Sequence, residues 1–547
     1  MNKKSENWIR AAGLMGIATL LSRVLGLVRE QVFAILFGAG NFTDAFNVAF
    51  RIPNLLRDLF AEGAMSASLV PTFTQARHEQ GDRGAWRVAG LVFRVLAATA
   101  VILSLLGILF APQLVGLYAA AFREIPGKLE LTIRMTRMMY PFFPFVALAA
   151  AFMGVLNACG VFFLPSFSSA LFNLTSIVVG VVLAKTADSF GIHPIEGMAI
   201  GVVVGGAVQA LCQLPSLYRV GYRWAKRSPG DPVWFRDPYL RRMLFLMIPG
   251  TWGLAATQVN VLVNTVLATS QGPGAVSWLN YAFRLMQFPI GVFGVSLAQA
   301  TLPRVSKFWV EKDYSGVEQS LTESLRHVFA INLPASAGLA FLGVPLINMI
   351  FQYGRFTSED SRATALALVM YSVGLTAYSA VKVLVPVFYA MGNTRIPVLS
   401  SALAVAVTIV LNLLMVRPFG YWGLALGTSV AAIFNAVYLL YSARRLLRQV
   451  GAGWNLSPVF SSFMKNAAVA LMMGGVVYGT NAALNWLIPD LLGLQWGGKP
   501  GLVMVRVIKV LAVVLEGVGV AAALGQAFGI TETLNMIRFV RKKLKMS

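Results

Sequence analysis

The chain has 547 residues, of which 57% are hydrophobic and only 12% are charged, and its mean hydropathy is +0.70. A soluble protein usually carries about 25% charged residues, so this composition excludes an ordinary soluble chain. Apolar stretches follow one another along the sequence, each long enough for the roughly 20 residues that a membrane-spanning helix needs. The composition therefore predicts an all-α polytopic membrane protein.

Apolar periods bounded by turn or charge signals predict about fourteen membrane-spanning helices. In chain order we place them at residues 9–37, 43–73, 88–111, 130–157, 164–185, 195–218, 240–269, 275–305, 318–351, 363–390, 397–416, 421–443, 463–486 and 502–527. The first six spans form an N-terminal lobe (residues 1–225) and the next six a C-terminal lobe (residues 226–455). Residues 456–547 hold two extra helices and a basic tail.

The charged loops predict the orientation of the chain. Three basic segments, residues 219–242, 444–448 and 541–545, all fall on the side that carries both termini. Cytoplasmic loops are rich in Lys and Arg, so this side is expected to be cytoplasmic. The formal charge of +23 then reflects orientation and contact with anionic phospholipids at the basic loops, and not nucleic-acid binding.

Common catalytic and metal sites are not expected. The chain has three His and two Cys residues, Cys159 and Cys212, too few cysteines for a disulfide framework or a four-cysteine zinc site. Sequence signatures of zinc proteases, P-loops and dinucleotide-binding loops are missing. We predict a protein that is not an enzyme and that uses no cofactor or metal.

Short motifs recur about 230 residues apart, in constant order. Residues 47–52 match 280–285, residues 158–171 match 390–403, and residues 197–201 match 423–427. Because each repeat holds an even number of spans, the two halves have the same orientation in the membrane. Parallel halves are typical of transporters that place the substrate between them and work by alternating access.

Ionisable residues fall inside the first two predicted spans, where they are costly. A charge at the centre of a membrane costs about 2.5–3.5 kcal/mol on insertion scales, so such residues normally face a protein interior or a water-filled cavity. The second span also has a polar stripe at helical spacing. The first-span charges are Arg23, Arg29 and Glu30, and the stripe and its neighbours are Asp44, Asn47, Arg51, Asn54, Arg57, Asp58 and Glu62.

The excess of arginine predicts an anionic ligand. Arginine suits bidentate recognition of phosphate, and the repeat pairs Arg51 with Arg284 of the second half. The alternative is that the arginines form internal ion pairs with the nearby carboxylates. Lys382, in the tenth span, is a further cation that could serve the ligand or extend toward the interface.

The same residues resemble the MurJ/MviN family over nearly the whole chain. The segments that carry the resemblance are residues 22–30, 37–40, 43–46, 53–64, 276–278, 284–286, 351–354, 356–357 and 371–374. The resemblance implies a lipid II flippase of the bacterial inner membrane, with two six-helix lobes and two last helices that form a groove for the lipid tail. Such a protein moves an undecaprenyl-pyrophosphate-linked peptidoglycan precursor from the cytoplasmic to the periplasmic leaflet.

The resemblance also implies roles for particular residues. It places a pyrophosphate clamp on Arg23, Arg29, Arg57 and Arg284 and an acidic position on Asp44. Supporting or gating roles are expected for Asp44, Arg51, Asn54, Glu62, Gln287 and Lys382. Some family members have acidic residues where this chain has Phe283 and Gln287. Because those carboxylates are missing here, the driving force stays open between a monovalent cation and the membrane potential.

Two other functions stay open at this point. The nearer is a related exporter of another polyprenyl-linked oligosaccharide or of a cationic drug, although a drug exporter should have unpaired carboxylates in its cavity. The other is a membrane-embedded glycosyltransferase, which would need a carboxylate base. Lipid II is the expected partner, and the cell-wall synthesis machinery is a further candidate.

Overall fold

All regular elements in the described part of the computed structural model are helices. The structure describes residues 3–61, 64–223, 237–487, 500–535 and 538. The chain forms two compact units: Met1–Phe33 with Gly40–Pro273, and Ala34–Ala39 with Gly274–Ser547. The expected all-α membrane fold is confirmed, and Glu62 and the basic tail at 541–545 lie outside the described residues.

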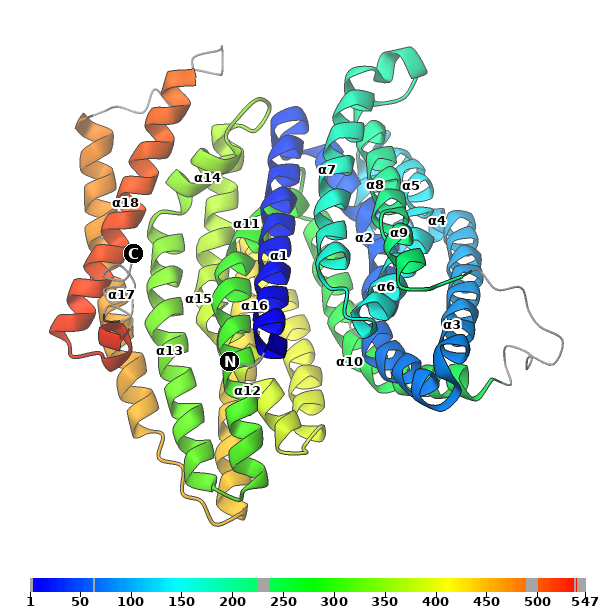
Figure 1. Ribbon diagram of the computed structural model, residues 1–547. Helices are drawn as coiled ribbons and strands as arrows, with labels where there is room; N and C mark the ends of the chain where they lie inside the picture. The colour runs from blue at the N-terminus through cyan, green and yellow to red at the C-terminus, as the bar shows by residue number, and fades with distance from the viewer. Residues whose placement is uncertain (1–2, 62–63, 224–236, 488–499, 536–537, 539–547) are drawn as a thin grey trace. The chain divides into compact units, whose positions relative to one another are not determined.

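The first unit holds the N-terminal helices, coloured blue to green in Figure 1. They are α1 (Lys3–Phe37, whose last turn belongs to the second unit), α2 (Asn41–Ala61), α3 (Ala64–Leu109), α4 (Ala111–Tyr118), the 3-10 helix η1 (Ala120–Glu124), α5 (Lys128–Met139), α6 (Phe142–Ala158), α7 (Phe163–Lys185), the 3-10 helix η2 (Ala187–Phe190), α8 (Pro194–Leu211), α9 (Leu214–Arg219) and α10 (Pro238–Thr269).

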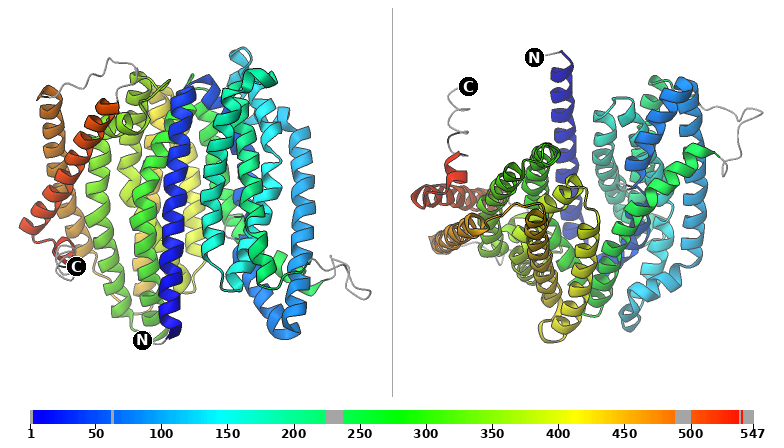
Figure 2. Two further views of the ribbon diagram at one scale, coloured as in Figure 1. Left: turned by 45° about the horizontal axis from the view of Figure 1, so that its top comes forward. Right: turned by 90° about the horizontal axis from the view of Figure 1, so that it is seen from below.

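The second unit holds the remaining helices. They are α11 (Ala275–Pro289), the π-helical turn η4 (Ile290–Gly294), α12 (Val295–Val310), α13 (Tyr314–Phe341), α14 (Gly343–Phe351), α15 (Ser358–Ala390), α16 (Arg395–Gln449), α17 (Ser457–Leu487) and α18 (Pro500–Ala527). The last two helices, orange and red in Figure 2, run beside one another along α13 and α14.

Helix lengths and composition fit a membrane. Within the described residues, nine helices are long and apolar enough to cross a bilayer, or ten if α13 and α14 form one span. Helix α16 contains two helices that meet at a non-helical Gly420, and α1 and α2 carry the intramembrane charges. The count of about fourteen spans therefore stays a prediction.

Several predicted boundaries differ from the helices observed. The predicted span 43–73 covers parts of α2 and α3, and α3 runs on through a non-helical Gly81 to Leu109, beyond the predicted end of the span. The predicted single span 318–351 bends by 75° between α13 and α14. Hydrophobic periodicity continues across the bend between α13 and α14, so it could not reveal that bend. Helix α10 belongs to the first compact unit, whereas the sequence repeat assigns its residues to the C-terminal lobe. The lobe boundaries that follow from the repeat therefore stay a prediction.

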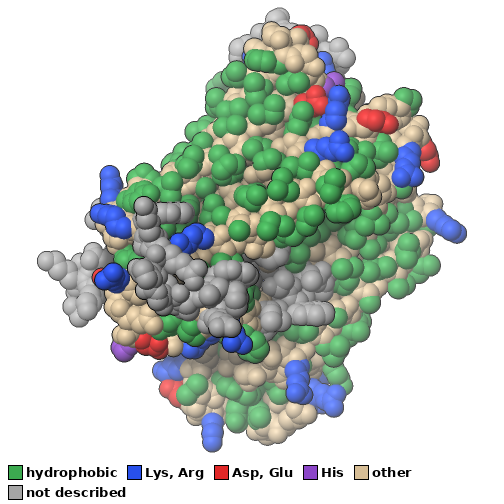
Figure 3. All heavy atoms as spheres, turned by 90° about the vertical axis from the view of Figure 1, so that its right-hand side faces the viewer, with side chains coloured by type: hydrophobic (Ala, Val, Ile, Leu, Met, Phe, Trp, Pro, Cys, Tyr) green, Lys and Arg blue, Asp and Glu red, His purple; other side chains and the backbone are tan. Residues whose placement is uncertain are grey.

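Exposed apolar side chains cover the outer surface of the helices. On the face shown in Figure 3, hydrophobic side chains form a broad area and most visible Lys and Arg side chains lie toward its margins. Helix α3 contributes Val101, Ile102, Leu105, Leu106 and Leu109, each at least 45% exposed. Such continuous apolar area is unusual for a soluble monomer and suits contact with lipid.

The repeated motifs form the same local structure in both units. Gly160 and Gly392 end α6 and α15 with positive φ angles of 81° and 71°. In the helix that follows each glycine, a serine hydroxyl donates to a proline carbonyl, Ser168 to Pro165 at 2.6 Å and Ser400 to Pro397 at 2.9 Å. The sequence repeat thus corresponds to a repeated helix–turn–helix unit.

The end of α1 is held against a loop of the second unit through glycines. The Arg355 amide donates to the Ile35 carbonyl at 3.0 Å. A Cβ on Gly354, whose φ is +59°, would overlap that same carbonyl, and a Cβ on Gly38 would lie 2.5 Å from the Arg355 oxygen. Two segments that are 316 residues apart in numbering therefore approach with no room for a side chain at either glycine.

We expect Gly354→Ala to destabilise the protein more than Gly392→Ala. Both glycines have positive φ, which costs an ordinary residue about 1–2 kcal/mol, but a Cβ on Gly392 meets nothing within 4 Å. The extra loss at Gly354 comes from overlap with the Ile35 carbonyl. Thermal unfolding of both purified variants in one detergent measures the difference, and equal shifts in the unfolding temperature would contradict this close contact.

Candidate functional site

Arg29 is buried in the first unit, where the sequence predicts a ligand-binding arginine. Its side chain on α1 is 8% exposed, and its Nη2 donates to the Glu30 carboxylate at 3.1 Å. The guanidinium also lies 5.7 Å from the ring centre of Phe50 on α2 and 5.6 Å from that of Phe172 on α7. The aromatic faces attract the cation, so Arg29 is held at a fixed place between three helices.

Arg57 is organised around the carboxylate of Asp58. Its Nε and Nη2 both donate to Asp58 Oδ1, at 3.1 and 2.7 Å. The other carboxylate oxygen accepts from the Asn54 and Gln258 amides, each at 3.3 Å. Gln258 comes from α10, so this polar cluster joins α10 to α2. The side chains of Arg57 and Asp58 remain 28% and 21% exposed.

Two of the predicted clamp arginines form internal ion pairs, as the alternative interpretation of the sequence expected. Arg29 and Arg57 each pair with the carboxylate that follows in the sequence. A guanidinium has five N–H donors, so pairing with one carboxylate does not by itself use all of its hydrogen-bonding capacity. Pairing of this kind fixes the orientation of each arginine and lowers the cost of burying it.

Arg23 and Arg51 differ in their surroundings. Arg23 is exposed on α1, and the carbonyl of the preceding Ser22 accepts a hydrogen bond from Asn173 of α7 at 3.2 Å. Arg51 is half-buried on α2 and interacts electrostatically with Tyr118 of α4. The backbone of α1 is thus hydrogen-bonded to α7 beside Arg23.

Asp44 forms a buried ion pair that the sequence did not reveal. Its carboxylate lies 3.3 Å from Nζ of Lys128, at the start of α5, and Lys128 also donates to Asn41 at 3.0 Å. The two charged side chains are 0% and 2% exposed, and the ammonium lies 4.0 Å from the Phe122 ring centre. Lys128 falls just before the predicted span 130–157, so helical periodicity gives no signal that it is buried.

The predicted site residues of the second unit lie on α11 and α15. Arg284 is half-buried, whereas Gln287 and Lys382 are exposed. Two contacts join α11 to α15: Phe283 packs against Tyr371 with ring centres 5.3 Å apart, and Trp278 donates to Asp360 at 3.0 Å. Arg284 belongs to a different unit from Arg23, Arg29 and Arg57, and the four-arginine clamp stays a prediction.

No metal-ligand cluster is formed by the side chains that the structure describes, since three or more His, Cys, Asp or Glu residues do not gather anywhere among them. The polar groups of the site are instead arginines, amides and single carboxylates. This set suits hydrogen bonding to an anionic group with several oxygens, such as a phosphate.

Comparison with known proteins identifies relatives over almost the full chain. The family model described as lipid II flippase MurJ matches residues 33–493. The lipid II flippase MurJ of Burkholderia cenocepacia is 35% identical over 482 residues, covering 88% of this chain and 91% of that protein. The probable lipid II flippase MurJ of Vibrio cholerae is 34% identical over 496 residues, with the same coverage.

Solved structures share the fold. A structure of lipid II flippase MurJ in an inward closed conformation superposes with a TM-score of 0.75 at 24% identity, covering 94% of this chain and 99% of that one. An inward-facing multidrug resistance transporter of the MATE family has a TM-score of 0.68 at 15% identity, covering 80% and 99%. The structures show the shared fold, and the family-model match with the 34–35% identity to named members establishes that the chain belongs to the lipid II flippase MurJ family.

Proposed function

We propose that this protein moves lipid II from the cytoplasmic to the periplasmic leaflet of the bacterial inner membrane by alternating access. The observation that carries the proposal is family membership over residues 33–493, in relatives that are named lipid II flippases. A multi-pass helical fold and parallel repeats suit a carrier that rocks around a central site. The relatives are transporters by name, and we propose that the lipid leaves chemically unchanged.

Arg23, Arg29, Arg57 and Arg284 are proposed to bind the pyrophosphate of the lipid. The buried Arg29 and the Asp58-bound Arg57 support this role, because each guanidinium is oriented before a ligand arrives. Asp44 and Asn54 are proposed to support the site through Lys128 and Asp58. Arg51, Glu62, Gln287 and Lys382 are proposed to line or gate the path of the headgroup.

The orientation, energy source and partners complete the proposal. The basic loops at residues 219–242 and 444–448 support our proposal that both termini are cytoplasmic and that these loops contact anionic phospholipids. Each positive charge that moves across the membrane responds to its potential by about 2.3 kcal/mol per 100 mV, so the potential can reset the empty carrier. A monovalent cation is the alternative driving force, and the cell-wall synthesis machinery would take up the product.

Complementation tests the function. Bacteria depleted of their own lipid II flippase should regain growth and periplasmic lipid II when they express this chain. At matched expression, Arg23→Ala, Arg57→Ala and Arg284→Ala should each reduce periplasmic lipid II about tenfold or more, because one charge-assisted hydrogen bond contributes about 1.5–3 kcal/mol. Periplasmic lipid II is measured by its accessibility to an externally added degrading enzyme.

Arg304→Ala is the matched control, because Arg304 is 68% exposed and its ion-pair contact with Glu323 is long, at 3.8 Å. Rescue that survives all three site substitutions would keep the function and remove the proposed site. A wild-type chain that inserts well and does not rescue would instead indicate an exporter of another polyprenyl-linked oligosaccharide. Chemical consumption of lipid II by the purified protein would indicate an enzyme.

A further inference from the structure

The carboxylate of Asp58 lies at the centre of the polar cluster around Arg57 in the first unit. Its Oδ1 accepts from Nε and Nη2 of Arg57, at 3.1 and 2.7 Å. Its Oδ2 accepts from the Asn54 amide of α2 and the Gln258 amide of α10, each at 3.3 Å. These bonds match the roughly four lone-pair sites of an ionised carboxylate. The position of Asp58 is therefore fixed from both helices.

Arg57 reaches Asp58 although the two side chains leave α2 in different directions. Successive residues of an α-helix point about 100° apart, and neighbours in the sequence do not share a face. Asn54 and Asp58 are four residues apart and do share a face, where Gln258 meets them. The guanidinium of Arg57 is thus drawn around α2 toward the face that contacts α10.

The two bonds to Asp58 also fix the plane of the Arg57 guanidinium. Both come from the edge formed by Nε and Nη2, and they converge on one carboxylate oxygen. Because the group is planar and rigid, its Nη1 then points away from that carboxylate. The side chains of Arg57 and Asp58 are 28% and 21% exposed, so the pair is accessible to a ligand.

We propose that Asp58 and Gln258 are positioning residues for lipid II that act through Arg57. Asp58 turns the guanidinium toward the α10 side of α2 and aims its Nη1 at the pyrophosphate, and Gln258 holds the second oxygen of Asp58. Helix α10 thereby contributes to binding without touching the lipid. The inference rests on the proposed function, in which Arg57 binds the pyrophosphate. Orienting a side chain before the ligand arrives reduces the entropy cost of binding, which is large for arginine.

Binding of lipid II to the purified full-length protein tests the proposal, with the dissociation constant measured by native mass spectrometry. Asp58→Ala should weaken binding about tenfold, which corresponds to about 1.4 kcal/mol. In a chain that already carries Arg57→Ala, the same substitution should change binding by less than about twofold, because no arginine remains to be positioned. Gln258→Leu should weaken binding about threefold, since Asp58 keeps its Asn54 donor. It also keeps the test valid if Asp58→Ala fails to fold.

Two further variants separate positioning from folding. Asp58→Asn should recover most of the binding, because its amide oxygen still accepts from Arg57 and the Asn54 and Gln258 amides can turn to present their oxygens. Gln319→Leu is the matched control, because it removes a bond of the same kind, from the Gln319 amide to the Glu323 carboxylate at 3.0 Å on the exposed surface of α13. It should leave lipid II binding unchanged.

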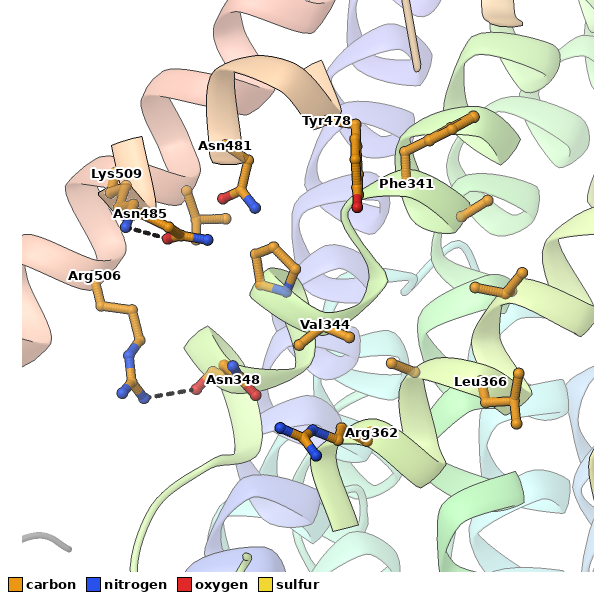
Figure 4. Close-up of a pocket in the computed structure, with 15 residues that line it drawn as sticks. Phe341, Val344, Asn348, Arg362, Leu366, Tyr478, Asn481, Asn485, Arg506 and Lys509 are labelled. Atoms are coloured by element: carbon orange, nitrogen blue, oxygen red, sulfur yellow. Dashed lines mark hydrogen bonds between the residues drawn. The ribbon is translucent and has the colours of Figure 1, made fainter. Parts of the chain in front are cut away.

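Labelling with an arginine-selective dicarbonyl reagent follows the orientation of Arg57 without any lipid, with peptide mass spectrometry as the readout. Asp58→Ala should raise the labelling rate of Arg57 about threefold or more, because the two bonds that hold its Nε and Nη2 are lost. Arg506 of α18 is the internal reference. Its Nη1 donates to the Asn348 carbonyl of α14 at 3.3 Å, within the second unit (Figure 4), so its labelling rate should stay constant.

Three outcomes would overturn the proposal. Tighter lipid II binding by Asp58→Ala would show that Asp58 competes with the lipid for Arg57, and equal losses with and without Arg57 would give Asp58 a separate role. An unchanged labelling rate of Arg57 would show that Asp58 does not orient it. A wild-type chain that does not bind lipid II, while Asp58→Ala still speeds labelling, would instead contradict the proposed function and keep Asp58 as the residue that orients Arg57.

Discussion

Arg29→Ala is expected to reduce lipid II translocation about tenfold to a hundredfold. The substitution removes a charge-assisted contact to the proposed pyrophosphate, worth about 1.5–3 kcal/mol, and each 1.36 kcal/mol is a factor of ten in rate. Arg29 is the most buried of the four predicted clamp arginines, and two aromatic rings and Glu30 hold it in place. Periplasmic lipid II in depleted cells, normalised to the amount of inserted protein, measures the effect.

The double variant Arg29→Ala/Glu30→Ala separates a functional role from a structural one. In the single variant, Glu30, which is 5% exposed, loses its arginine and becomes a costly buried carboxylate. The double variant removes that cost. If the double variant is as stable as the wild type and still inactive, Arg29 serves the substrate. If activity returns, Arg29 only neutralises Glu30, and the proposed clamp loses this residue.

Lys128→Met is expected to destabilise the first unit by about 3–5 kcal/mol, the usual cost of removing one partner of a buried ion pair. The Asp44 carboxylate is fully buried and would lose its lysine partner, and α5 would lose its side-chain contact with Asn41 on α2. Thermal unfolding of the purified protein in one membrane mimetic measures the loss. Expression at reduced temperature keeps enough folded protein for the comparison.

A matched exposed pair and a double variant complete this test. Arg304→Met breaks the exposed contact with Glu323 and should cost less than about 1 kcal/mol. Asp44→Asn/Lys128→Met removes both charges, and its stability should return to near the wild-type value, because a neutral pair avoids the burial cost. A double variant that is no more stable than Lys128→Met would show that the pair itself does not determine stability.

Transport by Asp44→Asn/Lys128→Met then addresses the gating role that the sequence suggested for Asp44. A stable double variant that no longer moves lipid II would place this ion pair in the conformational cycle. A stable and active double variant would restrict the pair to folding. The two outcomes differ because stability and translocation are measured on the same protein.

Patterns within the sequence determined the helical membrane fold, the repeat and the arginine-rich segments of the first two helices. These features depend on local periodicity and composition, which a single chain displays directly. The matched Ser168 and Ser400 hydrogen bonds show how reliably such local patterns translate into structure. The same local reading missed the bend between α13 and α14, because apolar periodicity continues through it.

Pairing between distant residues was decided only by the tertiary structure. Lys128 and Asp44 are 84 residues apart, Asn173 and Ser22 are 151 apart, and Gln258 and Asp58 are 200 apart. Each pair depends on how two helices pack and at what height they meet. Helical periodicity specifies which face of one helix is polar but not which helix it will face. The residue types of the predicted binding region could therefore be read along the chain, whereas the contacts that orient them arise only from helix packing.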